Sequence, residues 1–261
     1  MTRDDTTANA IVREIRDRAP FDPHASGGRR DIHQGYLLQD AVAAGLVDAG
    51  VRGPVAGYKI AVNAPALMAH FGVEEPASGR VFADQCHDSG AGLPADGFAD
   101  FAYEPEIAAV MGAPLRAGEA PFSRAAVAAC IDRMVPALEL LDLRGSNPPD
   151  QDLADVIAQN ISNAGAVIGG PGIAPDALDP AQVHTSVTID AAPELSVTGA
   201  APQHPLDAAH WLANHLARRG LSLAAGQIIL CGTHAPIRPV RGPARIDVAM
   251  SDLGTVSVAL K

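Results

Sequence analysis

The feature that most constrains the fold is an apolar run, residues 101–111, that alternates as a β-strand does and yet carries two carboxylates. Glu104 and Glu106 flank Pro105 near the middle of the run. Because side chains two apart in a strand point to the same face, both carboxylates project together. Proline cannot donate a hydrogen bond to a strand ladder, so we expect this strand to lie at a sheet edge or to begin there.

A third carboxylate, Glu139, lies inside a second apolar run, residues 135–143, between two leucines. A carboxylate in such a run is expected to be partly buried and then needs a partner. Three carboxylates without sulfur or imidazole in the motif suit a hard divalent cation, Mg²⁺ or Mn²⁺. The alternative is a solvated acidic strand edge, with Glu139 paired to an arginine. The short pattern alone favours that alternative, because short motifs are weakly specific.

Elsewhere the pattern changes from helical to extended along the chain. A helix is expected from a cap at Asp31 to Gly50, and a shorter one from a cap at Asn63 to Gly72. The segment 86–99 is rich in Gly, Asp and Pro and is expected to be a loop. Strands are expected at residues 55–62, 101–111, 135–143, 183–190, 194–198, 227–231, 244–250 and 255–260, with a helix over 205–219. We therefore predict an α+β fold, with a helical N-terminal part (1–85) against a strand-rich body (86–261).

The composition excludes several classes of protein. The chain has 261 residues, of which 48% are hydrophobic and 19% charged, enough for a sizeable core. Its net charge of −11 argues against binding to nucleic acid. The three cysteines, Cys86, Cys130 and Cys231, fit neither a disulfide framework nor a zinc site. With no signal peptide and no apolar run of membrane length, we expect a cytoplasmic protein without a membrane partner.

Lys59 is unusual because all but two of the 19 basic residues are arginine, and the other lysine is Lys261. An ammonium is a compact charge whose pKa shifts readily on burial, and the planar guanidinium of arginine cannot replace it. Lys59 lies between Tyr58 and Ile60 in the strand expected at residues 55–62. This position makes it a candidate catalytic residue, although codon bias alone would also explain the scarcity of lysine.

Several ordered motifs resemble those of the 2-keto-4-pentenoate hydratase family, the hydratase and decarboxylase branch of the fumarylacetoacetate hydrolase superfamily. Residues 57–68 (GYKIAVNAPALM) resemble the family pattern G-x-K-I-G-x-T-S. The resemblance continues through YLLQ, FGVEEP, GRVFAD, EPEIA, ALE, DVIAQNISNA, GQIILCG and DLGTV, in residues 36–39, 71–76, 79–84, 104–108, 137–139, 155–164, 226–232 and 252–256. It spans most of the chain in the family's order.

The resemblance implies a mixed β-roll surrounded by helices, one divalent metal ion (Mg²⁺ or Mn²⁺), a homo-oligomer, and small 2-hydroxy-2,4-dienoate or 2-oxo-enoate substrates. It implies that Lys59 reaches into the pocket. The residues that it implies for the metal are Glu104, Glu106 and Glu139, and those for substrate binding are Asn160, Ser162, Cys231 and Thr233.

Three departures from the family pattern bear on the reaction. Ala77 stands where many hydratases carry an acid–base aspartate. Cys231 replaces a hydroxyl that faces the substrate, and the K-I-G-x-T-S segment reads KIAVNA here, which changes the polarity beside Lys59. Of the nine histidines, for which we expect structural or exposed roles, His87 and His234 lie nearest these motifs.

The expected activity is that of a metal-dependent lyase that hydrates a 2-hydroxy-2,4-dienoate or 2-oxo-alkenoate to a 4-hydroxy-2-oxo acid. The absence of an aspartate at position 77 favours a second possibility, the decarboxylation of a 2-oxo-enedioate of the 4-oxalocrotonate type. A third possibility is a catalytically silent homologue that serves as a partner subunit. We expect the metal site to survive the departures in all three cases.

Overall fold

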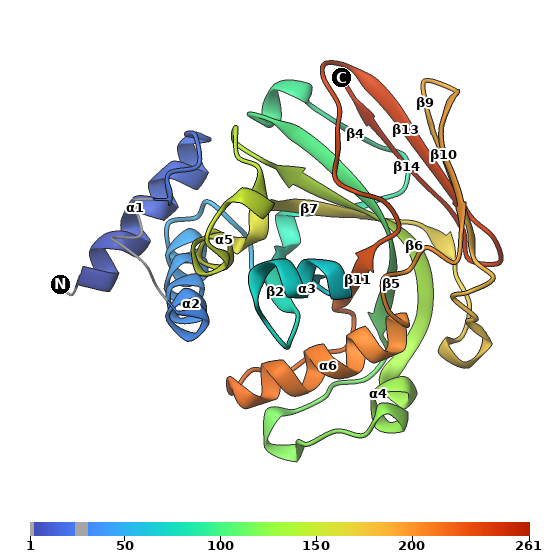
Figure 1. Cartoon of the computed structure of the whole chain (residues 1–261), viewed down its shortest axis with the longest axis horizontal. Coiled ribbons are helices and arrows are strands. Elements are labelled where there is room, and N and C mark those ends of the chain that lie inside the picture. Colours follow the sequence, from blue (N-terminus) through green and yellow to red (C-terminus); the bar gives the residue numbers. More distant parts are fainter. Residues whose placement is uncertain (1–2, 24–30) are drawn as a thin grey trace.

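The computed structural model describes residues 3–23 and 31–261, which form two β-sheets with helices around them (Figure 1). The expected α+β fold is confirmed. The helices are α1 (Arg3–Asp17), α2 (Ile32–Asp48), α3 (Pro65–Phe71), α4 (Arg124–Cys130), α5 (Leu153–Ala158) and α6 (Pro205–Arg218).

The first sheet holds the long strands predicted to carry the carboxylates. Within the described residues its strand order is β2-β1-β11-β5-β6-β7-β3, and β12 also pairs with β5. The pairs β1–β11 and β3–β7 are parallel and the others antiparallel. The strands are β1 (Val55–Ala61), β2 (Ala77–Phe82), β3 (Cys86–Asp88), β5 (Phe101–Met111), β6 (Ile131–Asp142), β7 (Asn163–Ile168), β11 (Ile228–Thr233) and β12 (Arg238–Pro239).

The second sheet covers one face of β5 and β6. In the part of the chain that is described its order is β10-β9-β13-β14-β4, with β8 on β14. The largest hydrophobic cluster joins this sheet to the first one and to α6, through residues such as Tyr103, Leu138, Val248 and Leu212. The strands are β4 (Ala91–Leu93), β8 (Gly170–Pro171), β9 (His184–Ile189), β10 (Ala192–Thr198), β13 (Ala244–Met250) and β14 (Gly254–Leu260).

The two N-terminal helices pack on each other at the end of the molecule opposite to β9 and β10 (Figure 1). As predicted, Asp31 caps α2: its carboxylate accepts the N–H of Gln34, whose side chain in turn accepts the N–H of Asp31. The division expected at residues 85 and 86 stays a prediction. Strand β1, which lies on the N-terminal side of that division, pairs with β11 from the C-terminal part of the chain.

Three local predictions are wrong. Residues 86–99 contain the short strands β3 and β4, because their backbones pair with β7 and β14 despite the turn-rich composition. The cap of α3 is Ala64, since the side chain of Asn63 instead donates to the carbonyl oxygen of Cys231 at 3.0 Å.

The third wrong prediction concerns Pro105, which lies inside the sheet and not at its edge. β5 pairs with β6 on one side and with β11 and β12 on the other. Proline is accommodated there because the β5–β11 register shifts between Leu230 and Thr233. At this irregularity the carbonyl oxygen of Pro105 accepts the N–H of His234 at 2.8 Å.

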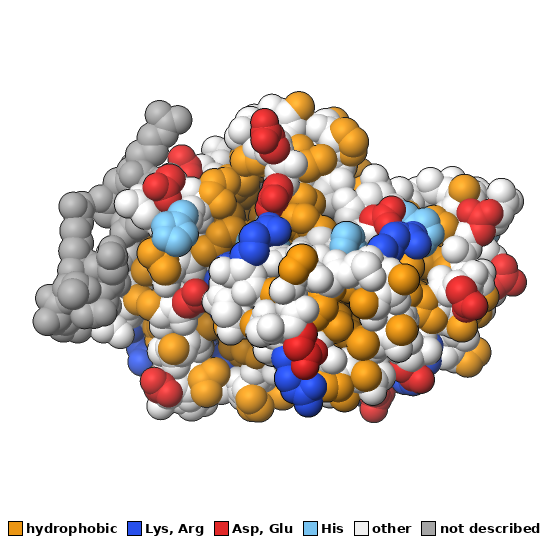
Figure 2. All heavy atoms as spheres, turned by 90° about the horizontal axis from the view of Figure 1, so that it is seen from below, with side chains coloured by type: hydrophobic (Ala, Val, Ile, Leu, Met, Phe, Trp, Pro, Cys, Tyr) orange, Lys and Arg blue, Asp and Glu red, His pale blue; other side chains and the backbone are white. Residues whose placement is uncertain are grey.

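The surface seen in Figure 2 carries acidic and basic side chains in small mixed groups among apolar ones. Arg218, at the end of α6, forms an ion pair with Glu75 at 2.8 Å, and both side chains are more than half exposed. Such exposed pairs contribute little to stability. None of the helices in residues 3–23 and 31–261 is long and apolar enough to cross a bilayer.

Candidate active site

Three buried carboxylates converge on the face of the first sheet that is turned away from the second. Glu104 and Glu106 project from β5, and Glu104 pairs in register with Glu139 of β6. One carboxylate oxygen from each lies within 4.8 Å of one from each of the others. The side chain of Glu139 is 0% exposed, so the solvated acidic edge considered from the sequence is excluded.

Two of the three carboxylates, those of Glu106 and Glu139, are held by groups from neighbouring strands. The N–H of Gly232 donates to Oε2 of Glu106 at 2.7 Å. Asn163 donates from Nδ2 to Oε1 of Glu139 at 3.0 Å, and Nζ of Lys59 lies 3.1 Å from the same oxygen. The partner of Glu139 is therefore the lysine and not an arginine. The second oxygen, Oε2 of Glu139, is buried and has no hydrogen-bond partner among the described residues.

The electrostatics of the cluster call for another cation. Burial, together with the charge of Glu139, raises the pKa of Glu104 to about 8 although Lys59 opposes the shift. Burial and the two neighbouring carboxylates also raise the pKa of Glu106. Burial alone would lower the pKa of Lys59, but the carboxylates outweigh it and the pKa lies above its usual value. Lys59 thus remains an ammonium, and its one positive charge does not balance three ionised carboxylates, so without a second cation Glu104 and Glu106 tend to hold protons.

The three glutamates fit a divalent metal ion. They offer only oxygen donors, which hard cations such as Mg²⁺ and Mn²⁺ prefer. A cation at this point would give the unpartnered oxygen of Glu139 a partner. It would also lower the raised pKa values of Glu104 and Glu106. The three residues that the resemblance implied for the metal are thus brought together by the fold.

Lys59 reaches the carboxylates because β1 lies between β2 and β11 and has a glycine beside it. Its partner in the register with β2 is Gly79. A Cβ atom at Gly79 would lie 3.2 Å from Cγ of Lys59 and 3.1 Å from the carbonyl oxygen of Asn160. Contacts this short are tighter than ordinary packing, so the lysine side chain occupies space that glycine leaves free.

The N-terminal residues that resemble the family's Y-x-x-Q hold β2 in place. The hydroxyl of Tyr36 accepts the N–H of Ser78 at 2.9 Å. Gln39 donates from Nε2 to the carbonyl oxygens of Ser78 and Ile157, both at 2.9 Å. Since Ser78 pairs with Ile60, these bonds connect α2 to the strand that carries Lys59.

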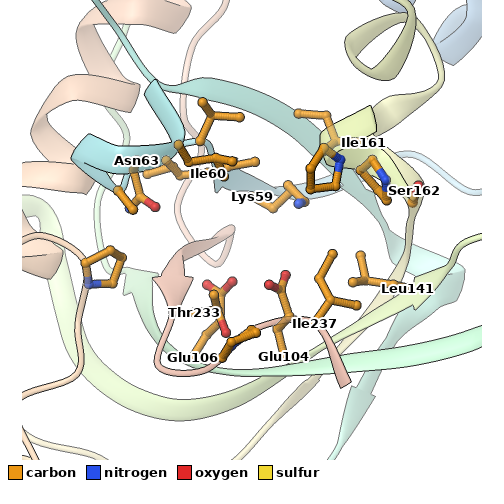
Figure 3. Close-up of a pocket in the computed structure, with 18 of the residues that line it drawn as sticks. Lys59, Ile60, Asn63, Glu104, Glu106, Leu141, Ile161, Ser162, Thr233 and Ile237 are labelled. Atoms are coloured by element: carbon orange, nitrogen blue, oxygen red, sulfur yellow. The ribbon is translucent and has the colours of Figure 1, made fainter. Parts of the chain in front are cut away.

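A cavity of about 430 Å³ opens beside the cluster (Figure 3). Lys59 faces Glu104 and Glu106 across it, and Thr233, Ser162 and other labelled side chains surround them. Apolar residues from α3, from α5 and from the segment 235–237 form most of the remaining wall. A concave apolar site with a few convergent polar groups is typical of small-molecule sites.

Of the four residues implied for substrate binding, the fold brings Ser162 and Thr233 to the cavity. Cys231 is not among the lining residues: it packs in the main core on the same face of β11 as Ile229. Burial raises its pKa, so it is held as a thiol. Asn160 is also absent from the lining, because its side chain bonds the backbone of Arg80 from both its oxygen (2.6 Å) and its nitrogen (2.8 Å).

Two segments of the cavity wall have a left-handed backbone. Val62 has a φ of 58°, and the turn Asn160–Ser162 has φ values of 58°, 52° and 55° at consecutive residues. This conformation is costly for the β-branched Val62 and Ile161. It places the side chain of Ser162 at the cavity, and the Asn160 bonds to β2 hold the turn there.

Sequence reasoning missed Asn163 and Gly232, which fix the glutamates, although both lie in segments that carry the resemblance. The available signals were a glycine, whose φ in the structure is 113°, and a short polar residue at the first position of a strand. His234 lines the cavity, and its Nδ1 lies 2.7 Å from Oγ1 of Thr185. His87 lies in β3 and lines a different cavity.

Comparison with known proteins tests the resemblance. Residues 83–260 match the family described as fumarylacetoacetate (FAA) hydrolase C-terminal. The chain belongs to the fumarylacetoacetate hydrolase family. Among curated proteins it is 33% identical over 210 residues to the 2-oxo-hept-4-ene-1,7-dioate hydratase of Escherichia coli. That match covers 77% of this chain and 77% of the relative. It is 32% identical over 233 residues to the TodF product hydratase of Pseudomonas putida, covering 89% of this chain and 85% of the relative.

A solved structure shares the whole fold. The 4-oxalocrotonate decarboxylase from Pseudomonas putida, complexed with magnesium and adipate, superposes with a TM-score of 0.88 at 25% identity. The match covers 100% of this chain and 99% of that one. The expected family and its β-roll are both confirmed.

Proposed function

We propose that the chain is a metal-dependent hydro-lyase that adds water to a 2-hydroxy-2,4-dienoate, or its 2-oxo-alkenoate tautomer, to give a 4-hydroxy-2-oxo acid. The observation that carries the proposal is the buried triad of Glu104, Glu106 and Glu139 opposite Lys59, beside a largely apolar cavity. The two hydratases that resemble the chain over most of its length support the same reaction class.

In this proposal Glu104, Glu106 and Glu139 hold Mg²⁺ or Mn²⁺. When bound, the ion supplies positive charge that attracts the substrate's carboxylate and 2-oxygen and stabilises negative charge on that oxygen. The carboxylates also keep Lys59 protonated, so its ammonium is available to hold the acid end of the substrate. Ser162 and Thr233 add hydroxyl groups to the cavity wall, whereas Asn160 and Cys231 support that wall from behind.

The reaction needs proton movements that Lys59 is placed to serve. Ketonisation removes the proton of the 2-hydroxyl and adds one at carbon 5, which leaves a double bond between carbons 3 and 4 conjugated to the ketone. Water then adds its hydroxyl at carbon 4 and a proton at carbon 3, so the product differs from the substrate by one water. The apolar wall limits bulk water at these carbons.

The test is direct. Purified protein with Mg²⁺ or Mn²⁺ is incubated with 2-hydroxypenta-2,4-dienoate in oxygen-18-labelled water. Loss of the dienoate absorbance and label at carbon 4 of the product support hydration. Protein treated with a chelator serves as the control. The proposal is contradicted if the metal-loaded protein, with either metal, neither consumes the dienoate nor incorporates the oxygen label.

A second activity, decarboxylation of a 2-oxo-enedioate, is favoured by one observation. The chain superposes over its full length on a 4-oxalocrotonate decarboxylase. In that reaction the carbon–carbon bond to the remote carboxylate breaks, its electron pair enters the conjugated system, and a proton later replaces CO₂. Release of CO₂ from 2-oxohex-3-enedioate, without label from water at carbon 4, distinguishes it from hydration.

Cellular setting and assembly complete the proposal. The three cysteines are unpaired, which suits the reducing cytoplasm. We propose a homo-oligomer, and α2 offers a surface for it. In the described part of the chain, the large apolar side chains left exposed are Leu37 and Val47, both on that helix. Light scattering coupled to size exclusion measures the assembly, and a monomeric mass at micromolar concentration contradicts this part.

A further inference from the structure

Charge is confined to one group of side chains in the cavity. The charged side chains among the described residues that line it are Lys59, Glu104 and Glu106, all at the metal-binding cluster. His234 also lines the cavity, but burial lowers its pKa to about 4, so it is neutral at pH 7. Nothing in the described lining therefore offers a cation to a second acidic group on the substrate.

The rest of the wall is built from two apolar clusters. One lies under α3 and α5 and includes Leu67, Phe71 and Val156. The other comes from the end of β6 and the segment before β12, with Leu141, Leu143 and Ile237. Figure 3 shows Ile161, Leu141 and Ile237 around Lys59 and the carboxylates, so apolar groups begin directly beside the charged side chains.

The cavity has more room than the reacting head group of a substrate needs. Its 430 Å³ corresponds to roughly fourteen water volumes of about 30 Å³ each. A five-carbon dienoate has about eight non-hydrogen atoms, each occupying no more than about one such volume. Space bounded by apolar side chains is left for a substituent beyond carbon 5.

We propose that the substrate carries an uncharged apolar tail, alkyl or aryl, at the end remote from its carboxylate, and that the site discriminates against dioates. The inference rests on the proposed function for the identity of the head group. An apolar tail gains from leaving water in this cavity. A second carboxylate would lose its hydration among leucine, isoleucine and phenylalanine side chains with no cation to compensate.

Binding of unreactive analogues tests the inference without depending on turnover. Mg²⁺-loaded protein is titrated calorimetrically with saturated 2-oxo acids: 2-oxobutanoate, 2-oxopentanoate, 2-oxohexanoate and 2-oxohexanedioate. We expect affinity to rise about fourfold for each added methylene. We expect 2-oxohexanedioate to bind about 100-fold more weakly than 2-oxohexanoate. Equal or tighter binding of the dioate, or no gain along the alkyl series, overturns the inference.

A variant with a new cation in the tail region sharpens the test. Ile237 is half-buried and lines the cavity, so Ile237→Arg places a guanidinium there with room to adjust. It should strengthen dioate binding at least tenfold and weaken that of 2-oxohexanoate. Ala125→Arg, at an exposed site on α4 outside the cavity lining, is the matched control and should change neither. An unchanged preference in a folded Ile237→Arg protein counts against an apolar tail region.

Turnover separates this inference from the proposed function. If alkyl-substituted 2-hydroxy-2,4-dienoates are hydrated and the corresponding dioates are poor substrates, both stand. If dioates are hydrated or lose CO₂ at least as fast, the tail inference fails while a lyase function stands. If no dienoate reacts but the binding series behaves as expected, the proposed hydration fails and the tail preference remains.

Discussion

Replacing Lys59 by methionine tests whether the lysine is catalytic or only balances the acidic cluster. Methionine keeps much of the length of the stem and removes the charge. Nζ of Lys59 lies 3.1 Å from Oε1 of Glu139, and the two side chains are 3% and 0% exposed. At an effective dielectric constant of about 20, their attraction is about 5 kcal/mol before desolvation is counted. Both readings therefore predict some effect on stability.

Removal of one partner of a buried ion pair typically costs about 3–5 kcal/mol. For a chain of this size that corresponds to a loss of roughly 6–20 °C in Tm for the metal-free protein. Mg²⁺ should raise the Tm of Lys59→Met more than that of the wild type, because the carboxylates have lost their other cation. The unfolding midpoints with and without Mg²⁺ measure both effects.

Turnover then decides between the two roles. A catalytic Lys59 predicts that the folded, metal-loaded variant loses on the order of 10²-fold or more in kcat, as for other lost acid–base groups. Lys261→Met is the matched control, because Lys261 is the other lysine of the chain and is exposed. Near-normal kcat in Lys59→Met, with lowered stability, would refute a catalytic role and leave the lysine a structural counter-charge.

Three further predictions follow from the same cluster. Glu106→Gln removes one charged ligand and should abolish both activity and the Mg²⁺-induced rise in Tm; an unchanged rise would exclude a three-glutamate site. In metal-free protein the raised pKa of Glu104, about 8 against about 4.5 unfolded, means that the native state holds the extra proton. Stability should therefore fall as pH rises between these values, and Mg²⁺ affinity should increase up to about pH 8; denaturation and calorimetry across this range measure both. Gly79→Ala puts a Cβ 3.2 Å from Cγ of Lys59 and should lower kcat about tenfold in a folded protein, whereas Gly118→Ala, with nothing within 4 Å, should not change it in the same assay.

The local sequence predicted those elements whose signal lies within the element itself. The strand 101–111 has the bounds expected from its alternation, and Asp31 begins α2 through the expected capping box. Predictions failed where distant partners decide. Asn63 has the chemistry of a cap, but its side chain bonds to Cys231, which lies 168 residues further along the chain. Pro105 is tolerated inside a sheet only because another strand changes register beside it.

The same distinction applies to the site. Alternation placed Glu104 and Glu106 on one face. The apolar surroundings of Glu139 and the scarcity of lysine singled out Glu139 and Lys59, and the resemblance assigned all four to one site, where the fold brings them together. The resemblance could not tell which residues of a motif face the cavity. Cys231 points into the core because of its parity on β11, a property set by the register with neighbouring strands.

The scarcity of lysine gives the chain a built-in chemical reporter. Lys261 is exposed and Lys59 is 3% exposed, so an amine-reactive reagent should modify Lys261 of the native protein before Lys59. Modification of Lys59 then requires the pocket to open or the chain to unfold. The rate at which mass spectrometry finds label at residue 59 would measure how often the pocket opens, and any ligand that closes it should slow that labelling.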